Sequence, residues 1–199
     1  TLIVNEQRKK LSKRDESIMQ FVSQYKDEGY LPDAMFNFMA LLGWSPEGEK
    51  EIFTKEELIK EFSENRLSKS PSMFDKDKLT WVNNRYIKDR SLENVIDLCK
   101  PFLEKAYDLS NRSEEWINML VATYHDQLSY GKEIVGLVDL FFNDELNLND
   151  EAKEFMQDES IPNTLKVFKN QLANLDEFTK ESIQMCIKAT QKEAKVRGK

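Results

Sequence analysis

The strongest candidate for chemistry in this sequence is a run of six residues near its start, Lys9-Lys10-Leu11-Ser12-Lys13-Arg14. It combines four cationic side chains with one hydroxyl. Cationic groups neutralise phosphate charge, and a hydroxyl or a backbone N–H adds short hydrogen bonds, so such a loop could hold a polyphosphate. Short basic clusters are also common on solvated surfaces, and the six residues taken alone favour that second interpretation.

The elements that must position this loop are a short strand before it and a helix after it. Thr1–Val4 is apolar and β-prone, which predicts a strand. Asp15 can cap a helix that ends at Gly29. Its apolar residues have the spacing of one buried face: Ile18, Phe21, Val22 and Tyr25.

The remainder of the chain predicts helices only. Three more are expected before residue 90, and a break at Ser70-Pro71-Ser72 precedes the last of them. Their start signals are Pro32, the capping-box pair Thr54 and Glu57, and Asp75. From Ser91 onward the expected spans are 91–106, 113–129, 131–142, 149–156, 162–174 and 179–195. The predicted fold class is therefore mainly α.

Composition is typical of a soluble globular protein, with 40% hydrophobic and 33% charged residues among 199. No apolar run reaches the roughly 20 residues that a membrane span needs, and a cytoplasmic protein is expected. Cys99 and Cys186 lie in helix-like apolar patterns and are expected to be reduced core residues. The absence of an initiator Met and the stop at Lys199 lead us to expect a piece of a longer protein.

Charge divides the chain near residue 90. Residues 1–90 hold 16 basic and 16 acidic side chains, whereas residues 91–199 hold 13 and 20 and carry the whole net charge of −7. Because nucleic-acid modules are usually basic, this acidity opposes RNA binding unless one face gathers the cations. The first part is thus the better candidate for phosphate contact.

The stretch Lys10-Leu11-Ser12-Lys13-Arg14 resembles the KMSKS signature of class I aminoacyl-tRNA synthetases, in the form found in bacterial glutamyl-tRNA synthetases. The resemblance is dense over residues 1–90 and thins afterwards. The matching segments are Thr1-Leu2-Ile3-Val4-Asn5-Glu6, Gly29-Tyr30-Leu31-Pro32-Asp33-Ala34, Asn37-Phe38, Leu41-Leu42-Gly43-Trp44-Ser45-Pro46, Glu51-Ile52-Phe53, Leu67-Ser68-Lys69-Ser70-Pro71, Phe74-Asp75, Lys78-Leu79 and Trp81-Val82-Asn83. An accidental basic loop would not carry this trailing block.

The resemblance implies that the parent enzyme ligates glutamate to tRNA in two steps, with ATP and Mg²⁺. Lys13 would contact ATP, while Lys10 and Ser12 would shape and assist the loop as catalytic residues. The family's other signature, of the His-Ile-Gly-His type, is absent, and the single histidine is His125. The chain alone is therefore expected to be catalytically incomplete, with neither ATP nor Mg²⁺ bound to it.

The resemblance also implies the domain organisation and the partners. Residues 1–88 would form the loop and a stem-contact domain, and residues 89–199 a helical anticodon-binding region that is truncated at its end and divides near residue 130. Arg85, Lys88 and Arg90 would meet tRNA phosphates, although a solvated helix end explains them equally well. The expected partner is tRNA-Glu, with tRNA-Gln left open; no DNA, membrane or second copy is expected.

Several other residues have plainer explanations. Trp44 could stack on a base but more often closes a small core. The helically spaced stripe of Trp116, Leu120, Tyr124 and Leu128 indicates packing, and His125 is expected to be structural or on the surface. A rival reading of the whole chain is a free-standing helical interaction module without any RNA or nucleotide role. That reading leaves the block from Gly29 to Pro46 unexplained.

Overall fold

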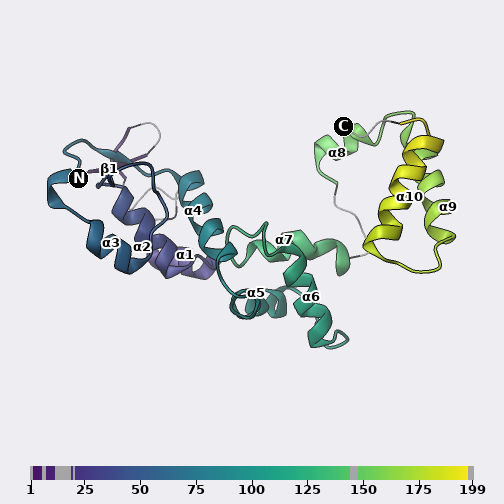
Figure 1. Cartoon of the computed structure of the whole chain (residues 1–199), viewed down its shortest axis with the longest axis horizontal. Coiled ribbons are helices and arrows are strands. Elements are labelled where there is room, and N and C mark those ends of the chain that lie inside the picture. The colour runs from purple at the N-terminus through teal and green to yellow at the C-terminus, as the bar shows by residue number, and fades with distance from the viewer. Residues whose placement is uncertain (1, 6–7, 12–18, 20, 144–147, 197–199) are drawn as a thin grey trace. The chain divides into compact units, whose positions relative to one another are not determined.

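A computed structural model describes all residues except 1, 6–7, 12–18, 20, 144–147 and 197–199. Helices dominate the described residues, and the only sheet found there has two short strands (Figure 1). The predicted mainly α fold class is thereby confirmed. The chain forms two compact units, residues 1–144 and residues 145–199. None of the described helices is long and apolar enough to cross a bilayer.

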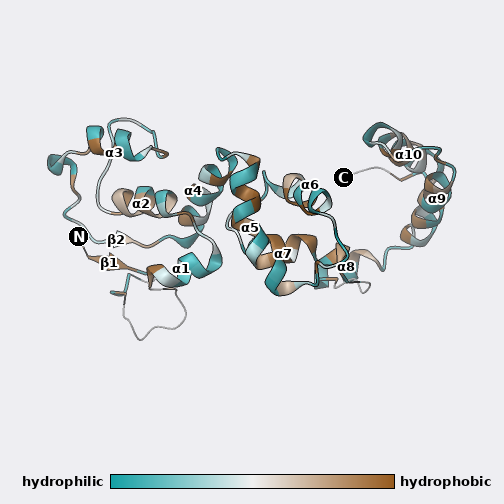
Figure 2. Ribbon diagram, turned by 90° about the horizontal axis from the view of Figure 1, so that it is seen from below, coloured by the Kyte–Doolittle hydropathy of each residue, from teal (hydrophilic) through white to brown (hydrophobic). Residues whose placement is uncertain are grey.

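The first unit begins with a short strand, which several helices follow along the chain. Strand β1 (Ile3–Val4) pairs in parallel with β2 (Ser72–Met73), Ile3 opposite Ser72 (Figure 2). Because parallel strands need a long crossover, the connecting residues hold three helices. These are α1 (Val22–Glu28), α2 (Pro32–Leu41) and α3 (Lys55–Glu61), with a 3₁₀ turn at Glu64–Arg66. The sequence predicted only a break in the chain at residues 70–72 and missed strand β2, because a two-residue strand is too short to show a sequence pattern.

Helix α4 (Lys76–Lys88) follows β2 and packs against α2. Its start is set locally, because the Asp75 side chain accepts a hydrogen bond from the backbone N–H of Lys78 at 2.9 Å. The capping box of Thr54 and Glu57 is likewise present at the start of α3. These predicted start signals are confirmed.

Helix α1 corrects the prediction of one buried face. Phe21 and Val22 are 52% and 74% exposed, and only Tyr25 is buried within the helix. The described helix starts at Val22, so these two side chains stand at its entrance, away from the core that Tyr25 joins. Ile18 and the predicted cap Asp15 lie outside the described residues.

The second half of the first unit is a small helical bundle. Helix α5 (Leu92–Ala106) packs against α6 (Glu114–Tyr124) and α7 (Glu133–Val138), which a 3₁₀ turn at Asp139–Phe141 extends. The helices predicted at 113–129 and 131–142 are shorter than expected. Residues 125–132 form a turn between them instead.

One hydrophobic core runs from Tyr25 to Val138 through both halves of the first unit. Leu120 and Leu128 are buried in it, and Trp116 and Tyr124 pack against it, which confirms that this stripe is packing. A second, smaller core holds Trp44, Phe53 and Leu58. Since Trp44 is only 2% exposed, the core interpretation is right and base stacking by this residue is excluded.

The second unit contains α8 (Asp150–Phe155), α9 (Ile161–Ala173) and α10 (Lys180–Glu193). Helices α9 and α10 pack side by side. Cys186 is buried in this unit, and Cys99 is buried in the first. Both are free cysteines, as predicted.

Candidate functional site

The lysine-rich loop is anchored to strand β1 at its start. The backbone N–H of Leu11 donates to the carbonyl of Ile3 at 3.2 Å, and Lys10 forms an antiparallel bridge with Val4. The chain turns between Asn5 and Lys9, where the Asn5 N–H donates to the Lys9 carbonyl at 2.8 Å. The described start of the loop, residues 9–11, therefore lies directly beside the strand.

Strand β2 holds β1 in place from its other edge. The N–H of Ser72 donates to the carbonyl of Leu2, and that of Phe74 to the carbonyl of Val4, both at 2.8 Å. These four backbone groups tie the base of the loop to the segment that enters α4. Lys9 and Lys10 are exposed there, whereas Ser12, Lys13 and Arg14 lie outside the described residues.

The three cations proposed for tRNA contact differ in their surroundings. Arg85 and Lys88 are exposed on the last turn of α4, three positions apart and hence on one side of the helix. Arg90 instead forms an ion pair with Asp33, Nη2 to Oδ2 at 3.0 Å. Part of its charge is therefore already neutralised by the first turn of α2.

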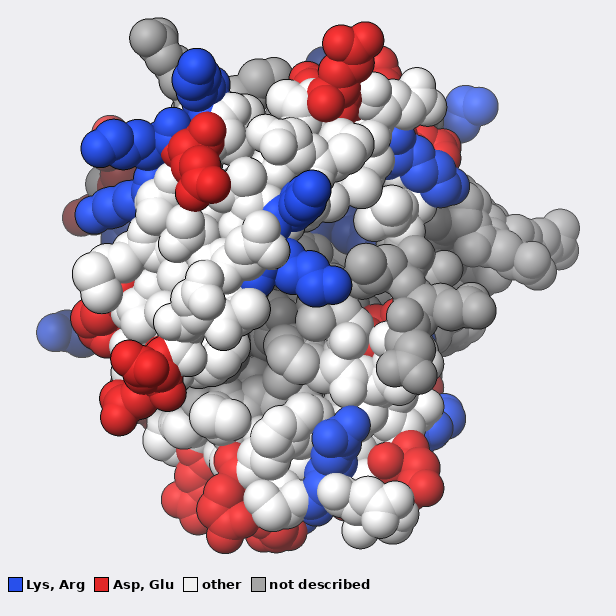
Figure 3. Space-filling model, turned by 90° about the vertical axis from the view of Figure 1, so that its right-hand side faces the viewer, with Lys and Arg blue, Asp and Glu red and all other residues white. Residues whose placement is uncertain are grey.

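The loop base and these cations belong to different ends of α4. Ten residues separate Asp75 from Arg85, which corresponds to about 15 Å along a helix axis. The structure thus leaves Arg85 and Lys88 as a separate cationic surface rather than a part of the loop. Elsewhere, acidic and basic side chains are interleaved on the face that Figure 3 displays.

His125 has a structural environment. It directly follows α6 instead of lying within a helix, and its Nε2 is 2.9 Å from the carbonyl oxygen of Ile87. No cluster of three or more His, Cys, Asp or Glu side chains that could hold a metal ion occurs among the described residues. The structural interpretation of this histidine is supported.

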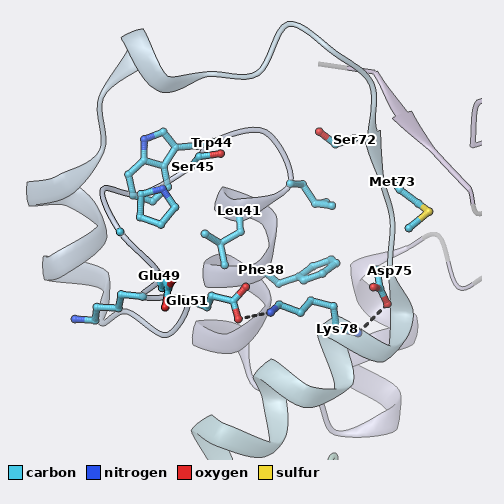
Figure 4. Close-up of a pocket in the computed structure, with 14 residues that line it drawn as sticks. Phe38, Leu41, Trp44, Ser45, Glu49, Glu51, Ser72, Met73, Asp75 and Lys78 are labelled. Atoms are coloured by element: carbon cyan, nitrogen blue, oxygen red, sulfur yellow. Dashed lines mark hydrogen bonds and ion pairs between the residues drawn. The ribbon is translucent and has the colours of Figure 1, made fainter.

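A pocket of about 710 Å³ lies between α2, the loop after it and β2, and sequence reasoning did not predict it (Figure 4). Lys78 points toward Glu51 across the pocket and forms an ion pair with it. The other cation that lines the pocket, Lys50, forms an ion pair with Glu57, with Nζ 2.6 Å from Oε1. The pocket walls are Phe38, Leu41, Leu42, Trp44, Ser45, Pro46, Gly48, Glu49, Lys50, Glu51, Ser72, Met73, Asp75 and Lys78. Because both lysines are paired with carboxylates, the pocket offers no uncompensated positive charge for a phosphate.

Comparison with known proteins gives strong matches along the whole chain. Glutamate–tRNA ligases of Lysinibacillus sphaericus and Bacillus subtilis are 59% and 56% identical to it over 203 aligned positions. Each comparison covers 100% of this chain but 42% of the relative, so the chain spans less than half the length of these relatives.

A solved structure has the same fold. The crystal structure of a glutamate tRNA ligase from Elizabethkingia meningosepticum, in complex with its amino acid, matches with a TM-score of 0.72 and 26% identity. The match covers 98% of this chain and 42% of that one.

Family models assign the two parts of the sequence. Residues 1–81 match the model described as tRNA synthetases class I (E and Q), catalytic domain, and residues 94–199 match the model of the anticodon binding domain. The first part of the chain matches class I tRNA synthetase catalytic-domain sequence, as the resemblance around the lysine-rich loop predicted. Because the second match covers more than half of the chain, the chain belongs to the anticodon binding domain family.

Proposed function

We propose that this chain is the tRNA-docking part of a glutamate–tRNA ligase and carries that enzyme's ATP-contacting loop. The observation that carries the proposal is the order of the two family matches along one chain, catalytic-domain sequence at residues 1–81 and an anticodon binding domain at residues 94–199. A free-standing interaction module, the rival reading, would have no reason to join them.

In this proposal the loop from Lys10 to Arg14 acts on ATP. In the parent enzyme the glutamate carboxylate would attack the α-phosphate of ATP and displace pyrophosphate. The activated glutamyl group would then pass to tRNA with release of AMP. Lys13 contacts the phosphates, and Lys10 and Ser12 shape the loop. The exposed Lys9 and Lys10 at the anchored loop base suit an anionic ligand. Mg²⁺ would accompany the ATP phosphates, in keeping with the preference of this ion for phosphate oxygens and water.

The chain by itself is proposed not to form the adenylate. A second signature of the His-Ile-Gly-His type would be needed, and the single histidine, His125, bonds to the Ile87 carbonyl instead. We expect no ATP–pyrophosphate exchange from the purified chain. Detectable exchange would contradict this part of the proposal.

tRNA docking is assigned to two regions. Residues 94–199 would take the anticodon arm, and Arg85 and Lys88 at the end of α4 would contact backbone phosphates nearer the inside of the L. Arg90 would contribute less, because Asp33 shares its charge. The expected partner is tRNA-Glu, with tRNA-Gln as an open alternative, and the chain is proposed to be a cytoplasmic monomer.

The domain boundary proposed at residues 88 and 89 falls between α4 and α5. It agrees with the gap between the two family matches, whereas the compact units divide at residues 144 and 145. The two divisions differ because the first follows the sequence families and the second follows the packing of the chain. The split near residue 130 would coincide with the turn before α7.

A binding titration tests the docking proposal. The purified chain is titrated with a tRNA-Glu transcript and with an unrelated structured RNA of equal length, at several salt concentrations. We expect tighter binding of tRNA-Glu and a linear fall of log affinity with log salt concentration, since phosphate contacts release counterions. No binding of either RNA would favour the rival interaction module, and equal affinity for both RNAs would contradict specific docking of tRNA-Glu.

A further inference from the structure

Two segments far apart in the sequence, residues 28–31 and 129–133, lie against each other and form what we call the joint. The N–H of Gly131 donates to the carbonyl of Gly29, and the N–H of Lys132 to the carbonyl of Glu28, both at 3.0 Å. Lys132 Nζ also pairs with Glu28 Oε1 at 2.7 Å. The two backbones are therefore joined directly, by hydrogen bonds from two consecutive residues.

Glycine permits this close approach. Gly29 has φ = 84°, and a Cβ on it would lie 2.8 Å from the Cα of Gly131. A Cβ on Gly131 would lie 2.8 Å from Cε2 of Phe102 on α5. A side chain at Gly29 would meet backbone, whereas one at Gly131 would meet the side chains of Phe102 and Leu98. The close approach of the two segments thus depends above all on the absence of a Cβ at Gly29.

Aromatic rings close one side of the joint. Tyr30 and Tyr130 are stacked, with ring centroids 5.3 Å apart and planes 4° from parallel. The hydroxyl of Tyr30 is in turn 3.0 Å from Oγ1 of Thr80 on α4. The stack therefore links the joint to the helix that carries the exposed cations.

Polar groups of α4 complete the joint. Buried Asn83 accepts from the Leu31 N–H at 2.9 Å through Oδ1 and donates to the Ser129 carbonyl through Nδ2. Its neighbour Asn84 donates to the Leu128 carbonyl at 2.7 Å. Hydrogen bonds weaken steeply when bent, whereas apolar contact is non-directional. The two amide side chains therefore hold the two segments in one orientation, which apolar contact alone would not do.

The joint lies between two sets of helices. Within the first unit, the helices that pack extensively belong to one set or the other, α2 with α4 before residue 90, and α5 with α6 and α7 after it. Helix α1, which follows the lysine-rich loop, ends at the joint, and α4 lines it. The contact between residues 28–31 and 129–133 therefore helps to set the relative orientation of the two sets, together with the hydrophobic core that they share.

We infer that the joint is a positioning element, which holds the cationic end of α4 and the α5–α7 bundle in one fixed frame so that a single tRNA contacts both. The inference rests on the proposed function. When two contact regions are held at a fixed spacing, the second contact forms at high effective concentration, and affinity for the whole ligand rises without new contacts. Loosening the joint should therefore weaken whole tRNA selectively.

The test compares whole tRNA-Glu with its isolated anticodon stem-loop on the full chain. Gly29→Ala should push the backbone of Gly131 away, whereas Gly48→Ala is the matched control, because Gly48 also has a positive φ and a Cβ there meets nothing within 4 Å. Hydrogen exchange at the amides of Gly131 and Lys132 reports whether the joint has opened. We expect Gly29→Ala to weaken whole tRNA by about tenfold or more and to leave stem-loop affinity within about twofold. Gly48→Ala should change neither affinity.

A second variant keeps the inference testable if Gly29→Ala fails to fold. Glu28→Lys with Tyr30→Ala removes the ion pair and the stack. Adding Lys132→Glu restores opposite charges and should recover part of the tRNA affinity. Faster exchange at the joint with unchanged tRNA affinity, or an equal loss for both RNAs, overturns the inference. If the wild-type chain binds neither RNA, the proposed function itself fails, whereas equal wild-type affinity for whole tRNA and stem-loop refutes only the joint's role.

Discussion

Gly29 and Gly131 lie back to back, with the position of a Cβ on Gly29 only 2.8 Å from both the Cα and the N of Gly131. Nothing about either glycine marks it as half of a pair. Their contact joins the end of the helix after the lysine-rich loop to the start of α7, and it makes sharp predictions about which substitutions the chain tolerates.

Alanine at Gly29 should destabilise the chain far more than alanine at Gly48. Both glycines have positive φ, 84° and 95°, so each substitution carries a left-handed backbone penalty of roughly 1–2 kcal/mol. Only Gly29 adds a clash with a rigid backbone, which should cost about 1–3 kcal/mol more. Chemical denaturation of both variants measures the difference in unfolding free energy. Equal values would show that the segments separate easily.

Asn83→Leu should lower the unfolding free energy by about 2–3 kcal/mol. The substitution leaves the Leu31 N–H and the Ser129 carbonyl without their partner in a buried setting. Asn163→Ala, at an exposed position in the first turn of α9, is the control and should lie within about 0.5 kcal/mol of wild type. Thermal unfolding followed by circular dichroism compares the two. A neutral Asn83→Leu would mean that water replaces the lost bonds.

The cations at the end of α4 should contribute unequally to tRNA binding. Arg85→Ala and Lys88→Ala should each weaken tRNA and reduce the salt slope of log affinity by roughly 1, because each loses a phosphate contact. Arg90→Ala should change the slope less, since Asp33 already neutralises Arg90. Filter binding between about 50 and 200 mM salt measures all three. A larger effect from Arg90 than from Arg85 would overturn this ranking.

Lys13→Ala should impair catalysis once the chain is supplied with the upstream residues of a full-length relative. A loss of about ten- to a thousandfold in the rate of glutamylation corresponds to a transition-state contact worth roughly 1.4–4 kcal/mol. Binding of tRNA should be unaffected, because the loop acts on ATP. An unchanged rate would remove Lys13 from the ATP site.

Both cysteines should resist thiol reagents while the chain is folded. Cys99 is fully buried, and burial raises the pKa of its thiol to about 12, so almost none of it is the reactive thiolate at pH 8. Cys186 is 5% exposed. A disulfide-exchange assay should find two reactive thiols only after denaturant is added. Rapid labelling of Cys99 under native conditions would show that α5 opens locally.

The sequence by itself determined the mainly α fold class, several helix starts and the family. Thr54, Asp75, Ser91 and Ser113 cap helices where expected, because each cap bonds to a backbone N–H three residues away and needs no distant partner. The lysine-rich loop was an ambiguous signal, and the block from Gly29 to Asn83 identified its relatives. Local chemistry and linear motifs are what a chain displays before it folds.

Only the tertiary structure decided which of these residues meet. Glu28 and Lys132 are 104 positions apart, and Arg90 and Asp33 are 57 apart, so no local pattern could pair them. The exposure of Phe21 and Val22 and the burial of Trp44 likewise depend on where the cores form. Helical periodicity states which residues share a side of a helix, but the packing of distant segments decides whether that side faces protein or water. The Gly29–Gly131 joint belongs to this second kind of information, because its backbone contacts exist only after both halves of the first unit have folded.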